Sequence, residues 1–454
     1  MNLVWFRNDL RLADNPALFH AIKENNSTLA LFLIHPEQHQ QHGEAPQKLE
    51  FIKAHVKDLC ERLKNFNIES LVYEIPTFND VPEIFEKIFQ QLSIDQVFFN
   101  ANYWLNEVRR DKAVKQFLDQ SGVSYQEYHS NYLLPPGTVR KTDGGMYHVF
   151  TPYKQKYIEA IKTQYKPPLS IPEPLEKSVG CELESDNLEV DLKLTEWAIG
   201  EQHISNQLKS FLQNTDYKEL RDYPATKGTS RLSPYFTVGV ISARQCLAHV
   251  LKQYGEDAFH STWVSELIWR DFYNDLMFEH PKLAKGKAFK ADAKDEWLNQ
   301  PELFQKWQKG ETGFPLVDAG MRQLLEEGWM HNRVRMVVAS FLSKLCLIDW
   351  RLGEAHFMAH LLDGDLASNN GGWQWSSATG CDAAPYFRIF NPTTQSKKFD
   401  PDGDYIRTYV PELKQVSAKE IHEPKTQTRI QCNYPIPMID YKSARQQALD
   451  WFKS

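Results

Sequence analysis

The chain has 454 residues, which is long enough for at least two packed domains. Hydrophobic residues make up 42% of it and charged residues 24%, a composition that excludes collagen-like, coiled-coil and wholly disordered chains. The formal net charge of −7 argues against a protein that coats nucleic acid by bulk electrostatics, although it is compatible with a local basic patch. The sequence has neither a membrane-length apolar stretch nor a signal-peptide pattern, so we expect a cytoplasmic protein with no membrane contact.

Residues 1–130 are predicted to form a Rossmann-like α/β domain. Short apolar runs alternate there with amphipathic stretches such as 46–66, where leucine and isoleucine recur at helical spacings. That order is typical of a parallel sheet with crossover helices. The motifs GxGxxG and GxxxxGK are absent, which excludes a dinucleotide fingerprint and a P-loop. The predicted strands are residues 3–6, 29–35, 70–75, 96–100 and 123–129.

Residues 131–195 are predicted to form a long connector, because prolines break up the periodic pattern and an acidic run follows them. Residues 196–454 are predicted to form an all-α domain, and this part contains ten of the twelve tryptophans. The two parts of the chain therefore have different roles. The predicted helices are residues 200–213, 241–254, 262–278, 314–327, 331–347 and 353–362.

One of these helices carries an unusual set of side chains on one face. Trp263, Glu266, Trp269, Arg270 and Tyr273 recur there at spacings of three, four and seven. Two interpretations stay open at this point. The segment is either a core helix in which Glu266 pairs with Arg270, or a surface that stacks on a planar heterocycle and hydrogen-bonds it.

Three further blocks combine polar groups with helix boundaries. His331 and Asn332 open a helix with an apolar continuation, either as capping residues or as groups that face a cavity. In residues 363–375, two glycines after two asparagines predict an irregular, ligand-holding loop inside a helical region. Residues 228–234 join small hydroxyl side chains to a predicted helix start, which suits phosphate oxygens or a plain N-cap.

Two patterns look like metal sites, but no metal site is predicted. His356 and His360 have the spacing of a zinc pair, but no general-base glutamate follows the first histidine. The run from Asp400 to Asp404 looks like a calcium loop, but its glycine is misplaced and no glutamate occupies the twelfth position. The six cysteines contain no CxxC pair and are expected to be reduced thiols.

Taken together, the blocks resemble the photolyase and cryptochrome family, specifically class I photolyases that repair cyclobutane pyrimidine dimers. The resemblance extends over the whole chain and keeps the family's motif order. The motifs that carry it are VWFRNDLRLADNPAL, GTSRLSPYFTVG, SELIWRDFY, WMHNRVRM, DGDLASNNGGWQW and DAAPYFRIFNP.

The resemblance implies an FAD that works as the fully reduced anion FADH− in the helical domain. Arg335 would pair with Asp363 beside the isoalloxazine ring, Asp365 would bind the polar edge of the ring, and Asn369 matches the position that faces flavin N5. A neutral amide there suits a reduced flavin. The other implied FAD-binding residues are Tyr217, Thr229, Ser230, Leu232, Ser233, Trp263 and Arg270.

The family's substrate is DNA that contains pyrimidine dimers, flipped out of the duplex into the pocket. The resemblance implies that excited FADH− gives the dimer an electron while Glu266 hydrogen-bonds a pyrimidine carbonyl. Trp269 and Trp375 would form an apolar wedge, with Asn332 and Met336 completing the lesion contacts. Phosphate-contacting positions are matched by Arg221, Arg333 and Arg388.

Two further sites come from the same resemblance. Trp373, Trp350 and Trp297 match an electron-transfer chain from the flavin to the surface. The other set matches a site for a folate antenna, 5,10-methenyltetrahydrofolate, and consists of His42, Asn106, Glu107 and Lys285.

The main alternative is a cryptochrome-type blue-light photoreceptor. Against it, Asn369, Trp375 and Glu266 follow the repair pattern, and the chain stops at Ser454 without a signalling tail. An enzyme for (6-4) photoproducts is expected to have two adjacent histidines where this chain has His331 and Asn332. A flavin- or nucleotide-binding protein with no DNA role would leave the arginines unexplained. We expect a monomer that needs no protein partner.

Overall fold

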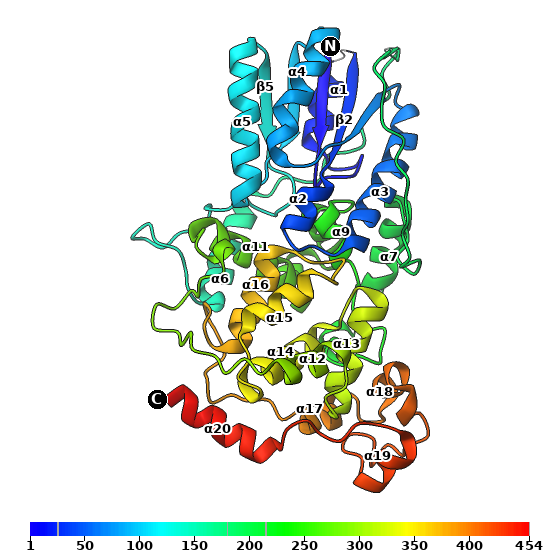
Figure 1. Ribbon diagram of the computed structural model, residues 1–454. Helices are drawn as coiled ribbons and strands as arrows, with labels where there is room; N and C mark the ends of the chain where they lie inside the picture. The colour runs from blue at the N-terminus through cyan, green and yellow to red at the C-terminus, as the bar shows by residue number, and fades with distance from the viewer. Residues whose placement is uncertain (25–26, 179, 214–215, 454) are drawn as a thin grey trace. The chain divides into compact units, whose positions relative to one another are not determined.

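The computed structural model describes residues 1–24, 27–178, 180–213 and 216–453 (Figure 1). The chain divides into two compact units. Unit 1 comprises residues 1–213 and 230–281, and unit 2 comprises residues 214–229 and 282–454. Each unit is therefore built from two separate stretches of chain. No helix in the described part of the chain has the length and apolar character that a bilayer crossing requires.

Unit 1 opens with a five-stranded parallel sheet in the order β3-β2-β1-β4-β5. Every residue of β1 and β2 is buried, which explains their nearly unbroken apolar sequences. Leu3 of the central strand lies opposite Leu29 on one side and Val97 on the other. The predicted parallel sheet is confirmed. The strands are β1 (Asn2–Phe6), β2 (Thr28–Ile34), β3 (Glu69–Glu74), β4 (Gln96–Asn100) and β5 (Ser124–Tyr128).

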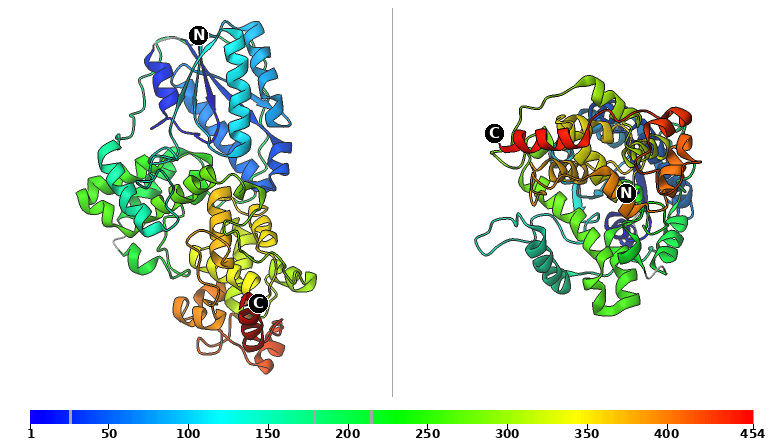
Figure 2. Two further views of the ribbon diagram at one scale, coloured as in Figure 1. Left: turned by 90° about the vertical axis from the view of Figure 1, so that its left-hand side faces the viewer. Right: turned by 90° about the horizontal axis from the view of Figure 1, so that it is seen from below.

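Helices cover both faces of this sheet (Figures 1 and 2). On one face Trp5 packs edge-on against Phe85, with ring centroids 5.3 Å apart, beneath α4 and α5. α1 lies on the other face, where Asn2 Nδ2 donates to the Ala21 carbonyl at 3.0 Å. Right-handed crossovers place α3 on the same side as α1. The helices are α1 (Pro16–Lys23), α2 (Pro36–Gln41), α3 (Pro46–Lys64), α4 (Val81–Gln91) and α5 (Leu105–Ser121).

The segment predicted to be a long connector contains a packed helix, α6. Phe150, Tyr153, Tyr157 and Ile161 recur along it at helical spacings and are all buried. Phe150 stacks on Trp269 of α11 with ring centroids 3.5 Å apart. The helices that complete unit 1 are α6 (Phe150–Gln164), α7 (Glu201–Leu212), α9 (Ser233–Val238), α10 (Ala243–Tyr254) and α11 (Thr262–Glu279).

Unit 2 is helical around one apolar core that includes Trp307, Trp350 and Trp373. α14 passes directly into a π-helical turn, Phe341–Leu345. The longer helices of unit 2 are α12 (Pro301–Lys309), α13 (Pro315–Glu327), α14 (Asn332–Ser340), α15 (Trp350–Met358), α16 (Leu366–Ser377) and α20 (Tyr441–Lys453). The shorter ones are α8 (Tyr217–Leu220), α17 (Pro392–Phe399), α18 (Asp404–Tyr409) and α19 (Thr426–Cys432).

One loop prediction is wrong. The two asparagines and two glycines of residues 369–372 lie inside α16, not in an irregular loop. The helix begins at Leu366, and the side chain of the preceding Asp365 caps it by accepting from Ser368 N at 2.8 Å. Asn370 makes a tertiary hydrogen bond to Glu354 at 2.8 Å. Such contacts override the weak helix propensity of asparagine and glycine.

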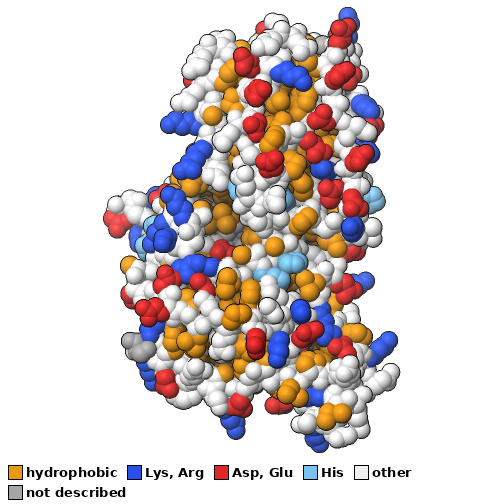
Figure 3. Space-filling model, in the orientation of Figure 1, with side chains coloured by type: hydrophobic (Ala, Val, Ile, Leu, Met, Phe, Trp, Pro, Cys, Tyr) orange, Lys and Arg blue, Asp and Glu red, His pale blue; other side chains and the backbone are white. Residues whose placement is uncertain are grey.

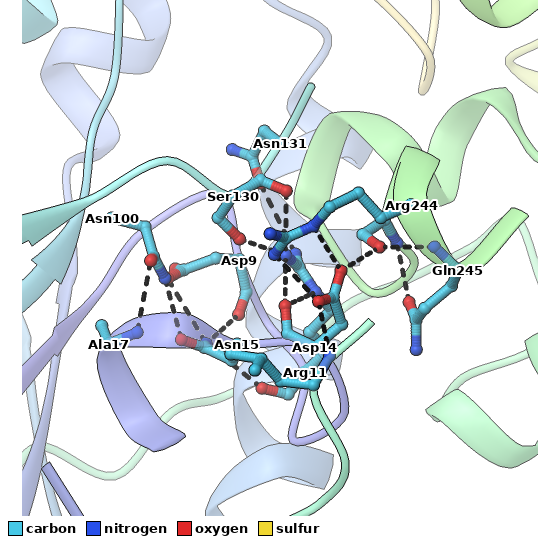
Figure 4. A network of polar contacts seen from close by, with 12 residues as sticks. Asp9, Arg11, Asp14, Asn15, Ala17, Asn100, Ser130, Asn131, Arg244 and Gln245 are labelled. Atoms are coloured by element: carbon cyan, nitrogen blue, oxygen red, sulfur yellow. Dashed lines mark hydrogen bonds and ion pairs between the residues drawn. The ribbon is translucent and has the colours of Figure 1, made fainter. Parts of the chain in front are cut away.

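Acidic and basic side chains are interspersed on the face drawn in Figure 3. A different set of charges is buried inside unit 1 (Figure 4). Arg11 and Asp14 are both 0% exposed. Asp14 accepts from Ser242 Oγ at 2.5 Å and pairs with Arg244 at 2.8 Å, while Arg11 donates to the Gly239 carbonyl at 2.8 Å. This network joins the loop after β1 to the start of α10. The buried charges are tolerated there because each of them has a partner.

Candidate functional site

The first turn of α14 sends two arginines toward different partners. His331 caps the helix, its Nδ1 accepting from Arg333 N at 3.2 Å. Arg333 forms an ion pair with Asp222 at 2.8 Å. Arg335 donates through Nη2 to both carboxylate oxygens of Asp363, at 2.9 and 2.7 Å. One helical turn therefore links a partly exposed carboxylate to a buried one.

The pair of Arg335 and Asp363 is largely removed from water. The Asp363 side chain is 4% exposed and that of Arg335 is 24% exposed. Arg335 Nε also donates to the Met330 carbonyl at 2.8 Å, which fixes the guanidinium plane. Removing one partner of such a buried pair costs about 3–5 kcal/mol, because the other charge is left without compensation.

Asn369 and Asn370 are both anchored to Glu354 on α15. The side-chain amide of Asn369 donates through Nδ2 to the Glu354 carbonyl at 3.0 Å. This bond uses the amide nitrogen of Asn369 and not its Oδ1, which is a hydrogen-bond acceptor. Asn370 Nδ2 donates to Glu354 Oε1 at 2.8 Å. Burial raises the pKa of the Glu354 carboxyl group to about 7, although the bond from Asn370 opposes the shift.

Sequence reasoning missed Glu354. The signal that could have indicated it is a carboxylate one turn after Trp350 in a mostly apolar helix. Its partners lie 15 and 16 residues further along the chain, so no local spacing rule connects them.

The tryptophans of the predicted electron chain all lie in the core of unit 2. Trp373 is 2% exposed and Trp350 is 0% exposed. Trp373 packs against Gly353, one turn after Trp350, so closely that an added Cβ would lie 2.1 Å from its Cη2. Trp297 lies beside the turn that precedes Trp350, because Leu298 N donates to the Leu347 carbonyl at 2.9 Å.

Asp222 organises two of the three arginines predicted to contact phosphate. It lies 2.8 Å from Arg333 and 3.9 Å from Arg221. The Arg333 guanidinium also lies 4.5 Å from the centroid of the Phe399 ring. This gives two fixed cations around one anion, a local positive excess that sequence reasoning missed because Asp222 has no motif of its own.

The third arginine, Arg388, lies on an exposed loop that is tied to the body of unit 2. Ala384 N donates to the Trp375 carbonyl at 3.2 Å, which connects the loop to the end of α16. Lys344 Nζ donates to the carbonyls of Pro385 and Arg388 at 3.1 and 3.2 Å. Lys344 is 1% exposed, and burial lowers its pKa to about 8.

Asn332 and Met336 lie on the same helix as Arg333. Asn332 is exposed and Met336 is half-buried. Met336 Sδ lies 3.9 Å from Arg333 Nη1. The residues of α14 predicted to contact DNA or the lesion therefore lie within its first five positions.

In unit 1, the predicted lesion-binding residue Trp269 belongs to an aromatic cluster. The half-buried Trp269 is fixed between Phe150 and Tyr273, whose ring centroid lies 5.5 Å away. Glu266 lies one turn earlier on the same helix and is half-buried. Phe150 was not predicted from the sequence, because it lies 119 residues before its partner in the supposed connector.

The remaining flavin residues that the sequence predicted are distributed over both units. Arg270 donates to the Asn131 carbonyl at 2.8 Å and lies 4.7 Å from the Tyr132 ring centroid. Trp263 is 7% exposed. Ser233 is the first residue of α9, and Ser230 and Leu232 precede it. Tyr217 opens α8, and Thr229 ends the short segment of unit 2.

Three of the four predicted antenna residues lie together on unit 1. Asn106 Nδ2 is 2.9 Å from His42 Nε2. Both His42 and Glu107 line a cavity of about 110 Å³ at the carboxyl ends of the strands. Glu107 is 8% exposed, and burial raises its pKa. The Glu44 carboxylate, 3.8 Å from His42 Nδ1, raises the pKa of His42. Lys285 belongs to unit 2.

Comparisons with known proteins identify the family of the chain. Residues 263–454 match the family described as the FAD binding domain of DNA photolyase, and residues 2–174 match the family described as DNA photolyase. The two matches define a flavoprotein with an N-terminal α/β domain. The chain belongs to the DNA photolyase family.

Individual relatives are similar along their whole length. The deoxyribodipyrimidine photo-lyase of Vibrio cholerae is 41% identical, with 100% of this chain and 99% of the relative covered. The crystal structure of a bacterial class III photolyase from Agrobacterium tumefaciens has a TM-score of 0.86 at 32% identity, with coverage of 100% and 97%. A cryptochrome from Synechocystis has a TM-score of 0.87 at 28% identity, with coverage of 99% and 98%.

Proposed function

We propose that the chain is a deoxyribodipyrimidine photolyase, an enzyme that uses light to split cyclobutane pyrimidine dimers in DNA. One observation carries this proposal. The first turn of α14 joins the partly exposed, arginine-rich cluster at Asp222 to the buried pair of Arg335 and Asp363. A repair enzyme needs this combination, because the group that binds DNA and the group that holds the flavin must act on the same lesion.

The residues of unit 2 fit a reduced flavin. Asn369 donates an amide N–H to the Glu354 carbonyl, and its Oδ1 would accept the N–H that N5 carries in a reduced ring. The Asp365 carboxylate would accept from the polar N–H edge of the ring, and the positive charge of Arg335 would favour the anionic form FADH−. The bound flavin supplies the light-driven electron. The other predicted FAD-binding residues keep that assignment as part of this proposal.

The protein residues handle the lesion itself. Glu266 hydrogen-bonds the pyrimidine carbonyl on which negative charge develops. Trp269 and Trp375 provide apolar ring surfaces for the flipped dimer, while Asn332 and Met336 complete its contacts. The stacking of Phe150 on Trp269 supports this role, because an indole that its neighbours hold rigidly loses little entropy when it contacts the dimer.

The decisive experiment measures loss of thymine dimers from ultraviolet-irradiated DNA in light and in darkness. Repair that depends on light is expected from the wild type. Glu266→Ala and Trp269→Ala are expected to retain bound flavin and lose repair or dimer binding. Tyr441→Phe, in α20 and outside every proposed site, is the control and is expected to repair normally. Full repair by both site variants would overturn the assignment of the lesion pocket.

A blue-light signalling role is the alternative function, and it rests on the similarity to a cryptochrome structure. The neutral amide of Asn369 and the arginine cluster at Asp222 favour repair. Absence of any light-dependent dimer loss by a flavin-loaded protein would favour signalling.

We also propose that the second chromophore is a folate, 5,10-methenyltetrahydrofolate. Glu107 supports this, because a buried carboxyl group suits the paired N–H groups of a pterin edge. The cavity of about 110 Å³ accommodates part of such a ligand. The test is a near-ultraviolet absorption band that survives flavin reduction and disappears in Glu107→Ala. A deazaflavin-type blue band would contradict it. Monomeric, partner-independent action in the cytoplasm completes the proposal.

A further inference from the structure

The buried position of Trp297 makes it a poor solvent end for an electron path. Its side chain is 9% exposed and packs in the core of unit 2. Its indole N–H is buried and has no acceptor among the described residues. An oxidised Trp297 would be a buried, unpaired positive charge that has no route for losing its proton, and such a charge is costly.

A second indole lies directly against it. Trp451, near the end of α20, has its ring centroid 5.0 Å from that of Trp297, with the two planes inclined by 35°. Trp451 is half-buried, so its ring bridges the core and the solvent. Lys294 fixes this position, because its Nζ donates to the Trp451 carbonyl and lies 5.0 Å from the ring centroid.

From this geometry we propose that Trp451 is a fourth member of the electron path and its true solvent end. The inference deepens the proposed function, since it rests on the path through Trp373, Trp350 and Trp297. In that proposed path, an electron that moves inward toward a light-excited flavin would leave a positive charge on Trp297.

The added step is a one-electron transfer between the two indoles. The oxidised Trp297 takes one electron from the neutral ring of Trp451 and returns to its closed-shell form. Trp451 becomes the radical cation and releases its N–H proton to water. A thiol in solution then reduces the Trp451 radical by one electron, a proton from water restores the indole N–H, and the thiol is oxidised. Proton loss at Trp451 prevents return of the electron.

The test compares the wild type with Trp451→Phe, Trp451→Tyr and Trp297→Phe, each with oxidised flavin. In Trp451→Phe the packing on Trp297 is retained, but the ring is too hard to oxidise. We expect the long-lived deprotonated tryptophan radical in flash absorption to disappear and photoreduction by thiol to fall several-fold. Trp451→Tyr should restore photoreduction and give a tyrosyl radical instead. Phe452→Leu, the neighbouring position in α20, should behave as the wild type.

A second measurement does not use the flavin. The holoenzyme is treated in darkness with a one-electron chemical oxidant, and the oxidised tryptophans are located by peptide mass spectrometry. Oxidation at Trp451 should exceed that at Trp297, and in Trp451→Phe the Trp297 product should increase. More product at Trp297 than at Trp451 in the wild type would overturn the inference.

The outcomes separate this inference from the proposed function. If Trp297→Phe loses photoreduction and Trp451→Phe matches the wild type, the path ends at Trp297 and only this inference fails. If Trp297→Phe matches the wild type, the predicted path fails, and Trp451 with it. In neither case does the light-dependent repair of dimers by chemically reduced enzyme depend on the result.

Discussion

Replacing Gly353 with alanine should displace Trp373, because this glycine lies where the ring needs space. An ideal Cβ at position 353 would lie 2.1 Å from Trp373 Cη2, 2.4 Å from Cζ3 and 2.8 Å from Leu342 Cδ2. Carbon atoms in contact are normally about 3.5–4.0 Å apart, so the ring must move by about 1.5 Å. Trp373 is 2% exposed and has Phe357 with its ring centroid 5.0 Å away, which leaves little room for that movement.

Overpacking of this kind costs typically about 1–3 kcal/mol, and three blocked contacts place Gly353→Ala near about 3 kcal/mol. Urea unfolding of the flavin-loaded protein measures this cost. Flash photolysis of the same samples should show slower reduction of the oxidised flavin, because Trp373 is the first member of the proposed path from the flavin to the surface. Leu352→Ala, at an exposed neighbouring position on α15, should change stability by no more than about 0.5 kcal/mol. Wild-type stability and photoreduction in Gly353→Ala would refute the reasoning.

Three other perturbations have expected signs. The folded pKa of Glu354 is raised to about 7, so its stabilising contribution is complete below about pH 4.5 and is lost as the pH rises through about 7. Glu354→Gln should therefore gain stability relative to the wild type as the pH rises from about 5 to about 8. A difference in urea unfolding that stays constant with pH would contradict this. Burial lowers the pKa of Lys344 from 10.5 to about 8, so the wild-type protein loses stability as the pH falls through that window. The stability of Lys344→Met relative to the wild type should therefore decrease as the pH rises from about 7 to about 10. Arg333→Ala should lower the slope of log affinity for duplex DNA against log salt by about 0.9, whereas Asp222→Asn should tighten DNA binding. Binding titrations in darkness measure both effects. An unchanged slope in Arg333→Ala would show that the DNA lies elsewhere.

The sheet was predictable because the strands carry their signal locally. β1, β2 and β4 are short apolar runs, and burial on both faces of a parallel sheet requires that pattern. The helices of residues 243–254 and 262–279 followed from their periodicity for the same reason. α15 was less well predicted: it begins at Trp350 instead of residue 353, because Asp349 caps it by accepting from Arg351 N at 3.0 Å.

The site was predictable only as a set of motifs. Arg335, Asp363 and Asn369 could be named because they belong to recognisable blocks, but the residues that position them could not. Glu354 has no motif, and its hydrogen-bond partners lie a helix away. The sequence also gave no reason to pair Asp222 with Arg333, which lies 111 residues later in the chain. Tertiary partners of this kind depend on how helices pack, and periodicity contains no such information.

The division of each unit into two stretches of chain has a consequence for synthesis. A ribosome completes all of unit 1 once residue 281 has been made, so that unit can fold while most of unit 2 does not yet exist. Residues 216–229 are made early, but the rest of unit 2 begins only at residue 282. The ion pair between Asp222 and Arg333 therefore cannot form until Arg333 has been made. A fragment that starts at residue 282 would contain the arginine and lack its carboxylate, so unit 2 cannot be obtained intact by simple truncation.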